Sequence, residues 1–161
     1  MNQTRTPVLT GGCQCGAVRY ALYATPHNPH VCHCRMCQKA FGAAYAPLAN
    51  VANADFAWTR GRPAVWKSSS VVERGFCAHC GTPLSFRYTD AARIGFSIGS
   101  LDDPAAVVPQ KAFGTESKLP WADAVPGLPA STTKGDIPAE RMEQLRSLQH
   151  PDHDTDRRGQ G

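Results

Sequence analysis

The fold of this chain has to accommodate seven cysteines that fall in three short groups. The groups have the spacings C-x-C, C-x-C-x-x-C and C-x-x-C, and their members are Cys13, Cys15, Cys32, Cys34, Cys37, Cys77 and Cys80. Thiolates this close together can face one soft cation. Zn²⁺ is the usual occupant because it is redox-inert and accepts a tetrahedral sulfur shell. The spacing therefore predicts a zinc protein.

Length and composition predict one domain without a membrane-spanning or secretory segment. The 161 residues, 42% of them hydrophobic, suffice for one modest core. No apolar run approaches the ~20 residues needed to span a bilayer, and the N-terminal segment 1–5 lacks the apolar stretch of a secretory signal. We therefore expect a cytoplasmic protein, in which thiols stay reduced and closely spaced cysteines serve metal binding or catalysis rather than disulfides.

The net charge argues against a nucleic-acid partner. The formal value of +4 counts every cysteine as a neutral thiol. Zinc-bound cysteines are thiolates, so seven of them remove seven charges and two Zn²⁺ ions return four, which leaves +1. Lysines and arginines are also scattered rather than clustered. We expect neither nucleic acid nor a membrane as a partner.

Short strands separated by turns predict a mostly β domain over residues 11–130, after a loose lead-in at 1–10. The first strand is expected within 17–23, two turns of helix within 35–41 before Gly42, and a return strand within 43–48. Further strands are expected within 54–59, 64–68, 71–76, 84–88, 93–98 and 107–113. Residues 131–161 should hold a short helix within 136–146 and a disordered polar tail from His150.

The number of cysteines suggests how they divide between metals. Closed structural zinc sites take four protein ligands, whereas catalytic sites keep three and leave a position for water or substrate. Glycine follows the first and third groups, where it lets the backbone turn tightly enough for N–H groups to approach the sulfurs. The expected ligands are Cys13, Cys15, Cys77 and Cys80 for the closed site, and Cys32, Cys34 and Cys37 for the open, catalytic site.

A rival division joins the two C-x-x-C pairs in one ribbon-like four-sulfur site. Its ligands would be Cys34, Cys37, Cys77 and Cys80, with Cys13, Cys15 and Cys32 left over. His33 and His79 stand between cysteines and are further candidates to replace one of them on either metal. The two divisions differ in which thiols lie together in space.

Several motifs occur together in a fixed order. They are Gly12–Gly16, Cys32–Lys39, Arg74–Leu84, Gly99–Pro104, Pro120-Trp121 and Gly127–Pro129. In this order they resemble the glutathione-dependent formaldehyde-activating enzyme (Gfa) family, also called the centromere-protein-V-like (CENP-V-like) family, over roughly residues 11–129. One departure is visible. Family members commonly carry a His-Ile-like pair before a phenylalanine, where this chain has Lys111-Ala112-Phe113.

The resemblance implies an Mss4-like, zinc-stabilised β fold with short helical turns. It also implies two zinc ions per chain, divided as the first arrangement above has them, one structural and one catalytic. The family's activity joins glutathione to formaldehyde and gives S-hydroxymethylglutathione, a carbon–sulfur lyase-type reaction. Glutathione and a small aldehyde are therefore the expected partners of this chain.

A zinc ion with three thiolate ligands is a poor Lewis acid for water but a good acceptor for a fourth thiolate. We therefore expect glutathione sulfur to take the open position and add to the carbonyl carbon of formaldehyde or a related small aldehyde. Arg35 and Lys39 share the metal turn and are the first candidates to hold the carboxylates of glutathione, followed by Arg74 and Lys111.

Two non-enzymatic interpretations are alternatives to this one. Both zinc ions can be structural, in which case the chain is a non-enzymatic binding module. Thiol addition to formaldehyde also proceeds without strong catalysis, so a glutathione-carrier domain is the other alternative. Trp121, in its Pro-Trp turn, is a candidate pocket wall, and the hydroxyls of Ser68–Ser70 are lesser candidates for substrate contact.

Overall fold

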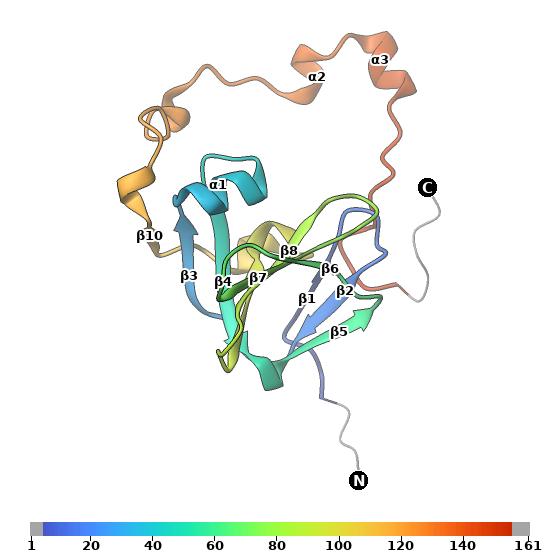
Figure 1. Ribbon diagram of the computed structural model, residues 1–161. Helices are drawn as coiled ribbons and strands as arrows, with labels where there is room; N and C mark the ends of the chain where they lie inside the picture. The colour runs from blue at the N-terminus through green and yellow to red at the C-terminus, as the bar shows by residue number, and fades with distance from the viewer. Residues whose placement is uncertain (1–4, 156–161) are drawn as a thin grey trace.

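Two β-sheets contain most of the regular secondary structure in the computed structural model, which describes residues 5–155 (Figure 1). The smaller sheet is antiparallel, in the order β1 (Leu9–Gly12), β2 (Arg19–Leu22), β5 (Phe56–Arg60). The larger sheet has the order β10-β3-β4-β9-β8-β7-β6. Its strands are β3 (His27–Cys32), β4 (Ala46–Ala52), β6 (Ala64–Lys67), β7 (Val72–Phe76), β8 (Pro83–Tyr88), β9 (Arg93–Ser97) and β10 (Lys111–Phe113). β10 pairs with β3 in parallel, and the other described pairs are antiparallel.

The helices are short. α1 (Arg35–Phe41) connects β3 to β4, and α2 (Thr133–Asp136) and α3 (Ala139–Gln144) follow the last strand. Single 3₁₀ turns lie at Asn53–Asp55, Ile98–Ser100, Pro104–Ala106, Thr115–Ser117 and Val125–Gly127. Among residues 5–155, none of the helices has the length and apolar character required to cross a membrane. The predicted mostly β fold with short helical turns is confirmed.

Two strands lie where the sequence predicts irregular chain. β1 begins at Leu9, inside the expected lead-in, and β3 contains Pro29 and lies where the sequence analysis expected no strand. The register of β3 against β4 shifts between His27 and His30, where Asn28 has a positive φ of 51°. Because a bulge removes residues from the ladder, Pro29 fits in the strand although it has no N–H to donate.

The main core lies between the two sheets, and Tyr20 is at its centre. The Tyr20 ring stacks on Phe56 with centroids 5.2 Å apart and meets Trp58 edge-on at 5.9 Å. Its hydroxyl group lies 2.8 Å from Ser100 Oγ, so the buried polar atom has a partner. Other side chains of this core are Leu22, Val51, Leu84, Phe96, Ile98 and Leu101. The sulfurs of Cys13 and Cys77 belong to the same cluster of buried residues.

A buried ion pair joins the small sheet to the loop after β9. Arg19, 2% exposed, donates from its two terminal nitrogens to the two oxygens of Asp102, at 2.7 and 2.5 Å. Thr10 Oγ1 donates to the same carboxylate. Burial opposes the ionisation of Asp102, but the bonds from Arg19 and Thr10 outweigh it and hold its pKa below the ordinary value.

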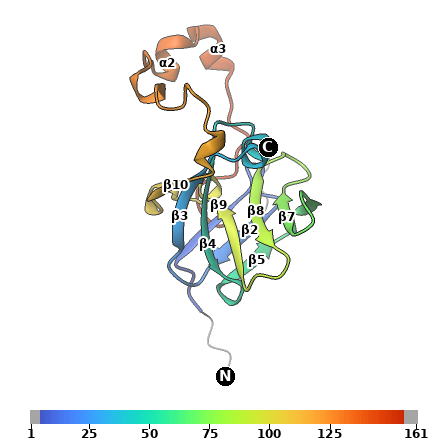
Figure 2. The ribbon, with the colours of Figure 1, turned by 60° about the vertical axis from the view of Figure 1, so that its left-hand side comes forward.

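The C-terminal segment leaves the sheets and then returns. Residues 118–148, which include α2 and α3, arch away from the strands in both views (Figures 1 and 2). The chain comes back at Gln149–Thr155, where the His150 N–H donates to the Gln14 carbonyl at 2.7 Å and Arg19 Nε donates to Asp154 at 3.1 Å. The sequence predicts disorder from His150. The structure differs at 150–155 because hydrogen bonds rather than apolar burial hold this polar segment, and residues 156–161 lie outside the described part.

Replacement of Asp102 by Asn should reduce the free energy of unfolding by about 3 kcal/mol, because it removes the buried, two-bond counter-charge of Arg19 and leaves only the half-exposed carboxylate of Asp154. Urea unfolding followed by circular dichroism measures the change. Glu73→Gln is the matched control. It removes a carboxylate from the Glu73–Arg87 pair, whose side chains are 30% and 47% exposed, and should cost less than about 1 kcal/mol.

The pH dependence of the same variant tests the origin of the effect. The pKa of Asp102 is lowered by folding, so the stability that it contributes is present above its unfolded-state pKa of about 4 and is lost as the pH falls through the lower folded-state value. The difference between the wild type and Asp102→Asn should therefore persist from neutral pH down to about 4 and shrink below it. An unchanged difference at pH 2 would contradict the ion-pair explanation.

Candidate functional site

Four thiols lie together beside the main core and are here called the four-thiol cluster. They are Cys13, Cys15, Cys77 and Cys80, whose sulfurs all lie within 4.8 Å of one another. The sulfur of Cys15 is 3.6 Å from that of Cys13 and 3.8 Å from that of Cys77. Tetrahedral zinc with bonds of about 2.3 Å places its sulfur ligands about 3.8 Å apart. The donor set and its spacing therefore fit a zinc ion.

Two tight turns build the four-thiol cluster. One follows β1 and the other joins β7 to β8, and each contains a glycine in the left-handed region, Gly16 with φ 71° and Gly81 with φ 77°. The N–H groups of these glycines bond to the carbonyls of Cys13 and Cys77. The resulting backbone brings the Val18 N–H to 3.2 Å from Cys13 Sγ. Such N–H groups stabilise thiolates, as expected from the glycine-flanked motifs.

The electrostatics of this cluster call for a cation. Burial raises the pKa of Cys13 to about 12 and also raises that of Cys15. Burial acts in the same direction at Cys80, but hydrogen bonds from the Thr82 hydroxyl and backbone outweigh it and lower the pKa to about 6. Four thiols at this spacing, of which Cys13 and Cys77 are buried, cannot all ionise unless a positive charge compensates them. A bound dication would supply that charge.

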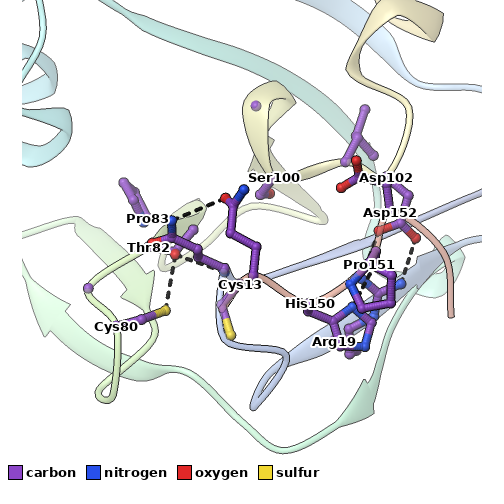
Figure 3. A pocket seen from close by; sticks show the side chains of 15 residues that line it. Cys13, Arg19, Cys80, Thr82, Pro83, Ser100, Asp102, His150, Pro151 and Asp152 are labelled. Atoms are coloured by element: carbon purple, nitrogen blue, oxygen red, sulfur yellow. Dashed lines mark hydrogen bonds and ion pairs between the residues drawn. The ribbon is translucent and has the colours of Figure 1, made fainter. Parts of the chain in front are cut away.

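A polar cavity of about 410 Å³ adjoins the four-thiol cluster (Figure 3). Cys80 and Thr82 lie on one side of it, and His150 and Asp152 of the returning C-terminal segment lie on the other. Several of its polar groups bond to the protein itself, such as Thr82 with Cys80 and Arg19 with Asp102. Because these groups already have partners within the protein, this cavity is not our candidate for a substrate site.

Three further thiols form a second group, here called the three-thiol cluster. Cys32 ends β3, Cys34 caps α1 and Cys37 lies in its first turn, and their sulfurs lie within 4.8 Å of one another. The Cys37 N–H donates to Cys34 Sγ at 3.4 Å. The structure thus brings together the sets of thiols that the four-plus-three division predicts. The four sulfurs of the rival division do not form a cluster.

Neither candidate histidine joins a cluster of potential ligands. His33 is 4% exposed, and its ring packs edge-on against Tyr45 with centroids 5.3 Å apart. Its Nδ1 atom has no hydrogen-bond partner among the described residues. His79 is exposed on the turn between β7 and β8. The metal ligands that the structure offers are therefore all sulfur.

Gln38 holds the three-thiol cluster in place. Its side-chain amide donates to the carbonyls of His33, at 2.7 Å, and Ser117, at 2.8 Å. The His33 N–H in turn donates to the Phe113 carbonyl at 2.8 Å. These bonds connect the metal-binding turn to β10 and the chain after it. Gln38 belongs to the Cys32–Lys39 motif, but sequence reasoning gave it no role because nothing local shows what its amide would reach.

Arg74 brings a buried positive charge to the three-thiol cluster. Its guanidinium lies 3.4 Å from Cys37 Sγ, bonds to Ser68 Oγ at 3.1 Å and covers the Phe86 ring. The pKa of Cys37 is lowered to about 5, first by the hydrogen bond with Cys32 and then by Arg74. That same bond to Cys37 raises the pKa of Cys32. Arg74, expected from the sequence to hold a substrate carboxylate, contacts a sulfur here.

The three-thiol cluster opens into a cavity of about 340 Å³, here called the thiol cavity. Its cationic and potentially cationic side chains are Arg74, Arg93, Lys111 and His30, and its aromatic ones are Phe86, Tyr88 and Phe113. No Asp or Glu is among the described residues that line it. The cavity is therefore suited to an anionic ligand that carries a thiol.

The other predicted substrate residues lie elsewhere. Arg35 and Lys39 are exposed on α1 and line a neighbouring cavity rather than the thiol cavity. Trp121 is 56% exposed and lines neither of them. Arg93, which the sequence analysis did not single out, lies at the start of β9. Only the pairing of β9 with β4 and β8 brings it to the cavity, and no local signal marks it.

Comparison with known proteins agrees with this geometry. The family model of the glutathione-dependent formaldehyde-activating enzymes matches residues 8–117, a stretch that holds both clusters and all ten strands. The chain belongs to this family. The match ends before the arching segment with α2 and α3, so those elements lie outside the stretch that the formaldehyde-activating family model describes.

The solved structures support the fold alone. A crystal structure of a Rhodobacter sphaeroides protein, a structural-genomics target, superposes with a TM-score of 0.53 at 21% sequence identity. The similarity covers 65% of this chain and 99% of that one. A search of curated proteins gave no match. What the Rhodobacter protein does is therefore not carried over to this member of the formaldehyde-activating family.

Glycine-to-alanine variants should separate two contributions to the stability of the turns around the four-thiol cluster, namely backbone strain and steric crowding. Gly81→Ala should cost about 1–2 kcal/mol of unfolding free energy, because only the left-handed backbone is strained and a methyl group meets nothing within 4 Å. Gly16→Ala should cost about 3 kcal/mol or more, because the methyl group would also overlap the His150 ring. Gly99→Ala, with neither problem, is the control and should stay within about 0.5 kcal/mol.

Urea unfolding gives all three values. Equal costs for Gly16→Ala and Gly81→Ala would show that His150 does not pack on the turn in solution.

Proposed function

We propose that this protein is a zinc-dependent enzyme that joins glutathione to formaldehyde or a related small aldehyde, or reverses that reaction. The observation that carries the proposal is the three-thiol cluster at the wall of a cation-lined cavity. Membership of the formaldehyde-activating family supports the same reaction. Seven free thiols also suit a reducing compartment, which is consistent with the cytoplasm.

In this proposal Cys13, Cys15, Cys77 and Cys80 hold a structural zinc, and Cys32, Cys34 and Cys37 hold a catalytic one. A zinc ion on three thiolates supplies a fourth position that binds a substrate thiol and lowers its pKa, so that the sulfur is nucleophilic at neutral pH. Arg74 offsets the surplus negative charge of the three thiolates from 3.4 Å. Its second bond, to Ser68, fixes the guanidinium in that position.

Glutathione has two carboxylates, and the thiol cavity offers cations for them. Lys111 and Arg93 are exposed side chains on β10 and β9 and line this cavity with the sulfurs. We assign them to the carboxylates in preference to Arg35 and Lys39, which face the neighbouring cavity. The addition itself forms a carbon–sulfur bond and opens the carbonyl. The thiol proton is released to solvent, and the carbonyl oxygen takes one up from solvent and becomes a hydroxyl group.

The zinc assignment predicts different results for the two clusters. The purified protein should contain about two zinc ions per chain, and Cys37→Ser should contain one and stay folded. Cys77→Ser should lose its fold, because the four-thiol cluster connects the turn after β1 to the turn between β7 and β8. Native mass spectrometry and circular dichroism measure both properties. If Cys37→Ser unfolds while Cys77→Ser stays folded, the three-thiol cluster is the structural site and the four-thiol cluster is not.

Binding of reduced glutathione should release about one proton, because the thiol becomes a thiolate at the site. Calorimetric titration of the zinc-loaded protein in two buffers of different ionisation enthalpy counts that proton. Cys37→Ser should abolish the release, and oxidised glutathione, which has no thiol, should give none. Lys111→Ala should weaken binding roughly tenfold and leave the proton count unchanged, because it removes only a carboxylate contact.

The rate of adduct formation separates the enzyme from the carrier alternative. Exchange NMR with labelled formaldehyde should show faster formation and decay of S-hydroxymethylglutathione than in buffer alone. Proton-releasing binding without any such acceleration would make the protein a glutathione carrier. Absence of binding would overturn glutathione as the substrate and leave the two metal centres as they are.

A further inference from the structure

The neighbouring cavity that Arg35 and Lys39 line, here called the apolar cavity, lies between α1 and the β6–β7 hairpin and is larger than the thiol cavity. Its volume is about 730 Å³. Large apolar side chains dominate its walls, and they are Met36, Phe41, Val65, Trp66, Phe76 and Pro83. Binding sites for small molecules are commonly cavities of this size with mainly apolar walls. Neither the family model nor the activity proposed above gives this space a ligand.

The apolar walls are unusually accessible. Trp66 is 62% exposed, Val65 59% and Met36 51%. Single exposed apolar residues are common on proteins, but a group of them around one hollow indicates a surface that binds something. The charged groups Arg35 and Lys39 belong to α1 on one side of this hollow. The chemistry of the remaining wall matches an alkyl or aromatic group.

The apolar cavity is adjacent to the thiol cavity. Met36 and Arg74 line both of them, so these two side chains form the boundary. Met36 precedes the sulfur ligand Cys37, and Arg74 donates to the Cys37 sulfur. A methionine side chain is flexible enough to adapt to different ligands. A group attached to a sulfur at the three-thiol cluster would enter the apolar cavity by displacing the Met36 side chain.

We propose that the apolar cavity binds the hydrocarbon substituent of an aldehyde larger than formaldehyde. The inference rests on the proposed function, because it places glutathione sulfur at the three-thiol cluster. The reaction is the same addition, in which the thiol and R–CHO give the S–CH(OH)–R adduct with no other product. Formaldehyde has no R group and leaves the apolar cavity unused. Glutathione is assigned to the thiol cavity instead, because the apolar side chains that dominate this wall offer no partners to its amides.

Two stable thioethers test the cavity without any turnover. S-methylglutathione and S-hexylglutathione differ by five methylene groups, and each methylene buried from water favours binding. Calorimetric titration of the zinc-loaded full-length protein should show S-hexylglutathione binding at least about tenfold more tightly. Reduced glutathione is titrated in the same series as the reference for the proposed function.

Trp66→Ala identifies the cavity that holds the hexyl group. Trp66 lies on the edge strand β6 and is largely exposed, so its removal leaves the core intact. This variant should reduce the advantage of S-hexylglutathione over S-methylglutathione to less than about threefold. Trp121→Ala is the matched control, since Trp121 is 56% exposed and lines neither cavity, and it should keep the full advantage.

The outcomes separate the two proposals. Equal affinity for the two thioethers, in protein that still binds reduced glutathione, overturns the apolar subsite alone. The same result is expected if residues 118–148 or a second copy of the chain cover the cavity. An advantage that survives Trp66→Ala unchanged, or that Trp121→Ala removes, also overturns it. Loss of binding of all three compounds overturns the proposed function as well.

Discussion

Repulsion between thiolates at close range is the constraint on which this structure depends. Cys13 and Cys77 are among the most buried residues, and they belong to the same core as Tyr20 and Phe96. Their cluster also connects the turn after β1 to the turn between β7 and β8, which lie in different sheets. Loss of charge compensation here would therefore place like charges inside the core that joins the two sheets. Metal binding at this cluster and packing of the core therefore depend on each other.

The two clusters differ in their surroundings more than in their ligands. Thr82, the backbone around Cys13 and the returning C-terminal segment close the four-thiol cluster. The three-thiol cluster has a buried guanidinium on one side and a cavity on the other. Both clusters border a cavity, but polar groups beside the four-thiol cluster bond to one another within the protein, whereas the thiol cavity offers the exposed cations Arg93 and Lys111 to a reactant. Arg74 contributes to both differences, because it neutralises charge and also forms part of the cavity wall.

The features that could be predicted from the sequence have short-range signals. The cysteine groups carry their spacing and glycines with them, and α1 spans Arg35–Phe41 as predicted, with Gly42 directly after it. Features that depend on long-range pairing could not be predicted. The bulge in β3 that accommodates Pro29, the arrival of Arg93 at the cavity and the docking of His150 all require a register or a partner from distant chain.

The contrast between short-range signals and long-range pairing also explains why sequence reasoning placed Arg35 and Lys39 before Lys111 as substrate-binding cations. Proximity in sequence favours Arg35 and Lys39, since they share the turn with the cysteines. On a helix, however, residues one or two positions from a ligand point in other directions, and these two side chains face the neighbouring cavity. Lys111 is 74 positions from Cys37, yet β10 pairs in parallel with β3 and places Lys111 opposite His30, two residues before Cys32. The departure from the family pattern at Lys111 thus lies at the thiol cavity.

The arrangement of the two cavities bears on what selects a substrate. Charged groups surround the sulfurs on one side, and a mainly apolar wall begins at Met36 on the other. In the reaction proposed above, the polar side recognises glutathione by its thiol and its carboxylates, whatever aldehyde is present. Discrimination between aldehydes then depends on the apolar side, where each buried methylene adds to binding. Recognition of the nucleophile and of the electrophile is thereby assigned to separate surfaces that meet at Arg74.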